Sequence, residues 1–180
     1  MVFTYGDMID RYGSAYQISR AVKAGEVYKL ARGVYSDVRH PDPNAIVCTL
    51  YPQAVLTMDS AFFLHGLTDV FPGAVHVATP RGATRIRMSE IRQHFMRPEL
   101  MRVGVRLVAG DDSPVRVFSR ERMLVELLRN AAKLPVDYYR ELIASYRRIA
   151  HDLDMSEVDA SLVLYRRSDA LFDMLQREVL

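Results

Sequence analysis

The chain has 180 residues, of which 49% are hydrophobic, and its formal net charge at pH 7 is +2. This hydrophobic content is sufficient for a folded core and excludes an intrinsically disordered chain. No apolar run approaches the roughly 20 residues that a transmembrane helix needs, so we expect no membrane partner. The first residues lack a basic segment followed by an apolar one, and the single cysteine, Cys48, excludes an internal disulfide. We therefore expect a cytoplasmic protein.

The first predicted elements are a short helix over residues 5–11, a second helix over residues 14–24 and a hairpin over residues 27–35. In the second helix, apolar residues recur at i, i+3 and i+4 and predict one buried stripe; they are Ile18, Ala21 and Val22. A serine precedes this helix as a predicted N-cap, and a glycine follows it as a predicted stop. In the hairpin, Gly33 suits the positive φ that closes a three-residue loop over residues 31–33.

A polar helix that leads into a tight hairpin is the arrangement with which a winged helix meets DNA. The predicted contacts of the helix with the DNA groove are Ser14, Tyr16, Gln17, Arg20 and Lys23. Lys29 and Arg32 project from the hairpin as predicted phosphate contacts. The same pattern also fits a hairpin packed on an amphipathic helix with a solvated basic face, so the residues by themselves leave both interpretations open.

Proline residues in the segment 40–44 indicate a linker, which predicts a winged-helix domain over residues 1–39 and a second domain over residues 40–180. The second domain begins with predicted helices over residues 44–50 and 58–64. Alternating or apolar runs then predict strands at residues 74–79, 93–96, 103–108 and 115–118. From Ser119 onward the apolar period is helical. The predicted fold class is α+β, with a minimal winged helix followed by a body that has a small antiparallel or mixed sheet and carboxyl-terminal helices.

Positive charge is concentrated in residues 81–106, where seven arginines stand against two glutamates, a net charge of +5. Such a local excess is typical of a surface that meets a polyanion. We therefore add Arg81, Arg85 and Arg87 to the predicted DNA contacts. Two alternatives remain for this stretch. Either its arginines are the solvent-exposed residues of strand edges, or they form a surface that binds an acidic protein partner and has no role in DNA binding.

No pattern of catalytic or metal-ligating residues is found. A single cysteine cannot build a zinc finger, and the five histidines lack the i, i+4 spacing of a ligand pair. We expect His65 to cap the carbonyls of its own helix and His76 to be a hydrogen-bonded structural residue. Asp111 and Asp112 are interpreted as a turn between two strands. The expectation is a protein with no enzymatic activity, no metal and no cofactor, although a nucleic-acid enzyme of unrecognised type stays an alternative.

Several segments together resemble the AbiEi-type antitoxins of type IV toxin–antitoxin systems. The resemblance runs from about residue 5 to about residue 150 and is carried by residues 18–25, 30–35, 60–67, 75–81 and 117–128. The Arg-Gly-Val-Tyr sequence of the hairpin is moderately specific by itself. It becomes fairly specific when the pattern Ser-Ala-x-x-Leu-His-Gly-Leu follows it.

This resemblance implies a winged-helix repressor that binds inverted repeats in its own promoter and counters a nucleotidyltransferase-like toxin. It also implies that the carboxyl-terminal domain carries the surface needed for neutralisation. The family usually has one more helix ahead of the helix pair, whereas only residues 1–4 precede the first predicted helix here. Either residues 41–66 close the winged core in its place, or the DNA-reading module of this branch is weaker.

Overall fold

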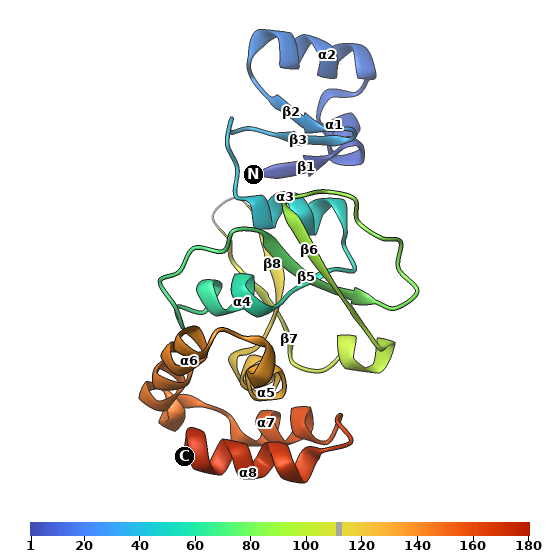
Figure 1. The fold of residues 1–180 in the computed structure, drawn as a ribbon. Coiled ribbons are helices and arrows are strands. Elements are labelled where there is room, and N and C mark those ends of the chain that lie inside the picture. Colours follow the sequence, from blue (N-terminus) through green and yellow to red (C-terminus); the bar gives the residue numbers. More distant parts are fainter. Residues whose placement is uncertain (111–112) are drawn as a thin grey trace. The chain divides into compact units, whose positions relative to one another are not determined.

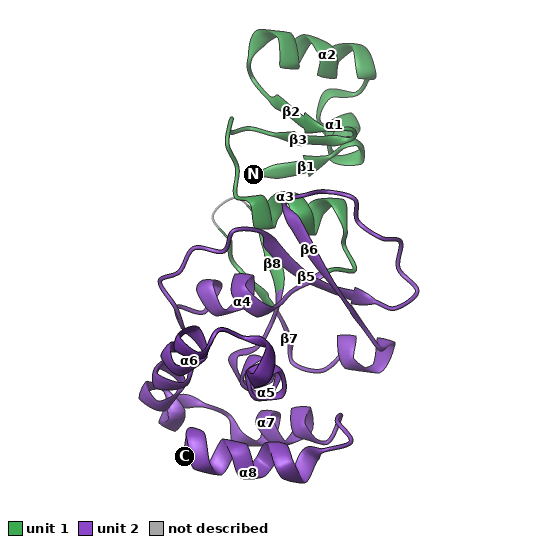
Figure 2. Cartoon of the chain, viewed as in Figure 1, with its two compact units in different colours: residues 1–54, 107–116 green, residues 55–106, 117–180 purple. Residues whose placement is uncertain are grey.

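The computed structural model describes residues 1–110 and 113–180 and confirms the α+β fold class, with a winged helix at the start of the chain (Figure 1). The elements form two compact units, one of residues 1–54 and 107–116 and the other of residues 55–106 and 117–180 (Figure 2). The boundary that we predict after residue 39 falls within the first unit. Asp111 and Asp112 lie outside the described residues. Within the described residues, no helix is long and apolar enough to cross a membrane.

The first unit contains a three-stranded antiparallel sheet in the order β1-β3-β2. Its elements are β1 (Val2–Thr4), α1 (Tyr5–Tyr12), α2 (Ala15–Ala24), β2 (Tyr28–Ala31), β3 (Val34–Ser36) and α3 (Pro43–Leu50). Both helices and the hairpin predicted for residues 5–35 are confirmed. The strand β1 was not predicted; it pairs with β3 along its whole length and extends the wing to three strands.

Polar side chains at the helix ends fix the helix pair in place. Thr4 and Asp7 form a capping box at the start of α1, and hydrogen bonds from Thr4 lower the pKa of the Asp7 carboxyl. The Ser14 hydroxyl accepts a hydrogen bond from the backbone N–H of Gln17, 3.3 Å away, and so caps α2. Gly25 ends α2, with its N–H directed to the carbonyls of Ala21 and Val22.

The sheet of the first unit is covered on both faces. On one face, Tyr35 packs with Met8 of α1 and Ile18 and Ala21 of α2 in a buried cluster. On the other face, Val2 and Val34 pack against Ala45 of α3 in a second cluster, with Leu30, Ile46 and Leu50 partly buried around them. Alternate residues of β3 therefore serve opposite faces. Helix α3 covers this second face of the sheet. Residues after the hairpin therefore complete the core in place of the additional helix that would precede α1.

The hairpin turn is tighter than we predict. Ala31 already pairs with Val34, which leaves only Arg32 and Gly33 in the turn, in place of the three-residue loop over residues 31–33. The pairing register shifts between Lys29 and Ala31, so a bulge absorbs one residue. Gly33 has φ 79°, the left-handed conformation that the sequence predicts for it.

The second unit holds most of a five-stranded sheet in the order β6-β5-β4-β8-β7. These strands are β4 (Val55–Leu56), β5 (Val75–Pro80), β6 (Ile91–Met96), β7 (Val105–Val108) and β8 (Val115–Phe118). The sheet is mixed, since β5 runs parallel to β6 and β4 parallel to β8, whereas β4 and β5 are antiparallel. Strand β4 was not predicted.

Helices accompany this sheet, and α5 is the most buried of them. They are α4 (Met58–Leu64), α5 (Arg120–Asn130), α6 (Val136–Arg148), α7 (Met155–Leu162) and α8 (Ser168–Glu178), with short 3-10 turns at Pro98–Met101, Ala131–Lys133 and Ala150–Asp152. Helix α5 is contacted by α4, α7 and α8, and Ser119 caps it as predicted. His65 is the C-cap residue of α4, and its backbone N–H is directed to carbonyls of that helix. Its ring does not contribute to this cap, because Nε2 lies 2.7 Å from the carbonyl oxygen of Phe118, the last residue of β8.

Candidate nucleic-acid interface

One face of α2 is exposed and carries the predicted DNA contacts. Tyr16, Arg20 and Lys23 are spaced i, i+4 and i+7, so they share the face opposite the buried Ile18 and Ala21. The Tyr16 side chain is 71% exposed. This face has no acidic residue, because α2 contains none. A neighbouring polyanion would therefore meet hydroxyl, guanidinium and ammonium donors without repulsion from a carboxylate on this helix.

The other two helix residues predicted to contact DNA have different surroundings. Gln17 is exposed and lies on the flank of the Tyr16–Arg20 face. Ser14 is half-buried, and its hydroxyl is engaged in capping α2. Its structural role is clear, whereas contact with DNA stays a prediction for this residue.

The wing adds two cations to this unit. Lys29 is directly opposite Tyr35 in the antiparallel register, and directly paired residues share one face of a sheet. Because Tyr35 packs against α1 and α2, Lys29 lies on the face of the sheet that these two helices cover. Arg32 is exposed at the tip of the hairpin, where Gly33 allows the tight turn.

The charged side chains of α2 and the wing are not engaged in polar contacts within the fold. Within residues 1–110 and 113–180, no hydrogen bond or ion pair involves the side chains of Arg20, Lys23, Lys29 or Arg32. Arg11 differs, because its guanidinium lies over the rings of Phe3 and Tyr12. We define the free set, Tyr16, Gln17, Arg20, Lys23, Lys29 and Arg32, as the α2–wing surface.

Five of the seven arginines in the stretch 81–106 fall into two groups. Arg81, Arg85 and Arg87 are exposed in the segment that joins β5 to β6, and they belong to the second unit rather than to the α2–wing surface. Arg97 donates to the carbonyl oxygen of Leu164 at 2.9 Å, and Arg106 forms an ion pair with Glu157. Those two arginines therefore stabilise contacts within the second unit.

The second unit also contains a cleft that the sequence did not indicate. Its centre holds His76 from β5, His94 from β6 and Asp59 from α4. His94 Nε2 lies 3.3 Å from His76 Nδ1, and His76 Nε2 lies 3.6 Å from Asp59 Oδ2. The hydrogen-bonded role expected for His76 is confirmed. Burial, with His76 and Arg92 close by, lowers the pKa of His94 to about 4, so its ring is neutral at pH 7.

Sequence reasoning missed this cleft because its residues are brought together by strand pairing. His76 and His94 are separated by 18 positions along the chain, and only the parallel register of β5 and β6 places their rings 5.2 Å apart. The one available signal was a histidine in each of two adjacent predicted strands. Without the register, that signal does not distinguish neighbours from residues on opposite faces.

Comparison with known proteins reveals similarity of fold only. No protein-family model matches the chain, and no curated protein matches it in sequence. The structure is similar to the crystal structure of the Rv2827c protein from Mycobacterium tuberculosis, with a TM-score of 0.59 and 16% sequence identity. The match covers 96% of this chain and 71% of that chain. It supports the α+β fold alone.

Proposed function

We propose that the first unit binds double-stranded DNA as a winged helix and that the chain is the antitoxin and autorepressor of a type IV toxin–antitoxin operon. The observation that carries the DNA-binding part is the α2–wing surface, in which Arg20, Lys23, Lys29 and Arg32 are exposed and have no partner among the described residues. Unpaired cations on a helix face and an adjacent wing are what binding to a phosphate backbone requires.

The residue types suggest a division of roles. Arg20 and Gln17 carry donors and acceptors that suit base edges in the major groove, where arginine pairs with guanine and glutamine with adenine. Lys23, Lys29 and Arg32 suit phosphate oxygens, and the Tyr16 hydroxyl also suits a phosphate. The cap at Ser14 and the packing of Ile18 and Ala21 hold α2 rigidly, so these side chains start from a fixed helix.

The test is binding of the full chain to a labelled fragment of the promoter upstream of its own gene, followed by fluorescence anisotropy. We expect tighter binding to this fragment, and to its inverted repeats, than to unrelated DNA of the same length. The double variant Arg20→Gln/Arg32→Gln should weaken binding to the promoter at least about tenfold. The matched control is Arg140→Gln, which changes an exposed arginine of α6 in the second unit. Equal binding by both variants would overturn the proposed interface.

The antitoxin role has its support in the resemblance of residues 18–25, 30–35 and 60–67 to the AbiEi-type family. It predicts that co-expression of this chain restores growth to cells that produce a nucleotidyltransferase-like toxin from the neighbouring gene. The double variant Arg20→Gln/Arg32→Gln should still restore growth, because its changes affect only the α2–wing surface. No rescue by the wild-type chain would refute the antitoxin role and leave the DNA-binding proposal standing.

A further inference from the structure

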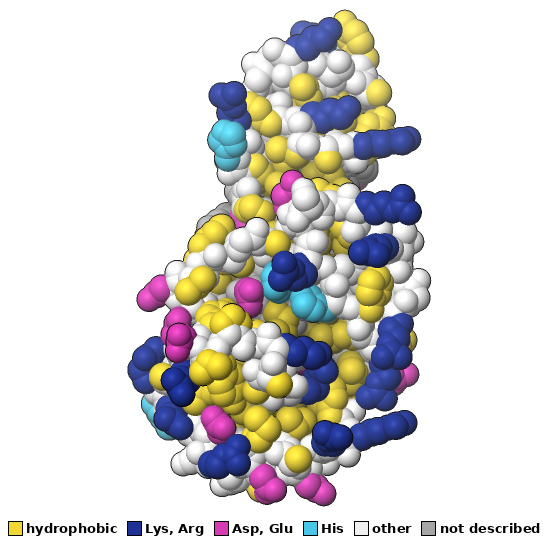
Figure 3. Space-filling model, in the orientation of Figure 1, with side chains coloured by type: hydrophobic (Ala, Val, Ile, Leu, Met, Phe, Trp, Pro, Cys, Tyr) yellow, Lys and Arg dark blue, Asp and Glu magenta, His cyan; other side chains and the backbone are white. Residues whose placement is uncertain are grey.

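The cleft around His76 and His94 has the size of a site for a small organic ligand. Its volume is about 660 Å³, within the range of ligand pockets in proteins. All of its lining residues belong to the second unit. In Figure 3, histidine side chains lie beside Lys, Arg and acidic side chains on the visible face of this unit, with hydrophobic side chains around them.

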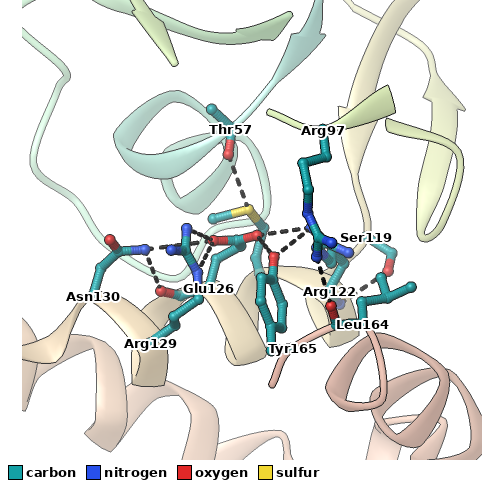
Figure 4. A network of polar contacts seen from close by, with 10 residues as sticks. Thr57, Arg97, Ser119, Arg122, Glu126, Arg129, Asn130, Leu164 and Tyr165 are labelled. Atoms are coloured by element: carbon teal, nitrogen blue, oxygen red, sulfur yellow. Dashed lines mark hydrogen bonds and ion pairs between the residues drawn. The ribbon is translucent and has the colours of Figure 1, made fainter. Parts of the chain in front are cut away.

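Glu126 and Arg129 line the cleft and belong to a cluster of polar contacts that also includes Arg122 and Tyr165 (Figure 4). Glu126 is fully buried and accepts hydrogen bonds from Arg122 Nη2 at 2.8 Å and from Arg129 Nη2 at 2.6 Å. Burial by itself would raise the pKa of Glu126, but Arg129 and Arg122 outweigh it and lower the pKa, so the carboxylate is ionised. The Tyr165 hydroxyl adds no charge, because burial and Glu126 raise its pKa.

Within this cluster two arginines share one carboxylate, an excess of one positive charge. The other carboxylate of the cleft lining is Asp59, whose Oδ2 lies 3.6 Å from His76 Nε2. Arg122 is fully buried, and its Nε and Nη1 have no hydrogen-bond partner among the described residues. Arg129 reaches the cleft with 37% of its side chain exposed. Because an unbalanced charge is costly in a buried setting, an anion bound beside Arg129 would stabilise this cluster.

Further cations and an exposed phenyl ring complete the lining. The side chains of Arg92 and Lys133 are exposed, line the cleft and form no hydrogen bond or ion pair with any described residue. Phe71 is 72% exposed at the same cleft and packs edge-on against Phe63. An exposed aromatic ring beside free cations provides a surface for a planar ring next to a site for an anionic group.

We propose that this cleft binds a nucleotide, with its phosphate held by Arg92, Arg129 and Lys133 and its base against the ring of Phe71. The neutral His94 and the amide of Asn130 supply further hydrogen-bonding groups in the lining. A metal ion fits the cleft less well. Within the described part of the chain, no three acidic, histidine or cysteine side chains are arranged to hold one.

The test is isothermal titration calorimetry of the full chain with AMP, GMP, CMP and UMP, and with inorganic phosphate and the free nucleosides as partial ligands. We expect at least one nucleotide to bind about tenfold more tightly than phosphate or its own nucleoside, since it uses both parts of the site. The variant Arg92→Gln/Lys133→Gln should lower that affinity at least about tenfold, because each change removes a donor to a charged group. Phe71→Ala should weaken nucleotide binding and leave phosphate binding unchanged.

Arg140→Gln is the matched control, since it removes an exposed arginine outside the cleft. Circular dichroism spectra equal to that of the wild type would establish that each variant is folded. The proposal is overturned if none of the four nucleotides binds at millimolar concentration. It is also overturned if phosphate binds as tightly as every nucleotide, or if Arg92→Gln/Lys133→Gln binds as well as the control.

Discussion

Replacing Glu126 by glutamine should be among the most destabilising changes of a single functional group in this chain. The carboxylate and Arg122 are both fully buried, and the same carboxylate accepts two hydrogen bonds from Arg129. Glu126→Gln preserves the size of the side chain but leaves Arg122 as a buried cation without a counter-charge. Loss of one partner of a buried ion pair costs about 3–5 kcal/mol, a large fraction of the 5–15 kcal/mol typical of a whole domain.

The assay is urea unfolding followed by circular dichroism at 222 nm. With a denaturant dependence of roughly 2–3 kcal/mol per molar urea, the midpoint should fall by about 1–2.5 M. The matched control is Glu157→Gln, which removes a carboxylate from the partly exposed pair with Arg106 and should cost less than about 1 kcal/mol. Adding Arg122→Met should reduce the cost of Glu126→Gln, because the buried cation is then gone. Equal free energies of unfolding for Glu126→Gln and Glu157→Gln would refute this reasoning.

Three further changes test other parts of the structure. Gly33→Ala forces a left-handed φ of 79° on a residue with a side chain. In urea unfolding it should lower the free energy of unfolding by about 1 kcal/mol, and in anisotropy measurements it should weaken promoter binding. Gly104→Ala should cost more, about 2 kcal/mol or above in urea unfolding, because its Cβ would lie 2.6 Å from Cβ of Arg122. Stability should also fall as the pH drops from about 6.5 to 4, because unfolded His94 binds a proton in this window while folded His94, with a pKa of about 4, stays neutral. After allowance for solvent screening, the loss from His94 is about 1–2 kcal/mol, and His94→Gln should remove it from unfolding curves recorded at pH 7 and pH 4.5.

The helices and the hairpin of the first unit were predictable because their signals are local. Ser14 and Gly25 mark the ends of α2, and the spacing of Ile18, Ala21 and Val22 marks its buried face. Strand β1 was not predictable, since three residues are too few for a period and their pairing with β3 is a tertiary contact. The role of α3 in closing the sheet was foreseen only as one of two alternatives.

The sheet of the second unit shows the same limit. Four of its five strands could be located from apolar runs. The parallel pairing of β5 and β6 could not be predicted, because residues 81–90 join them without the helix that usually connects parallel neighbours. The cleft depends on that pairing and on the burial of Arg122 and Glu126 within α5. An arginine and a glutamate at i, i+4 on a helix ordinarily indicate a solvated pair, so their sequence spacing gives no sign of burial.

The central proposal, DNA binding by the α2–wing surface, is tested most directly by the salt dependence of promoter affinity. If Arg20, Lys23, Lys29 and Arg32 each neutralise one phosphate, each contributes about −0.9 to the slope of log K against log salt concentration. The Arg20→Gln/Arg32→Gln variant should then have a slope shallower by about 1.8 than the wild-type chain, while Arg140→Gln should leave the slope unchanged. A slope and an affinity identical in the wild type and the double variant would contradict the proposal.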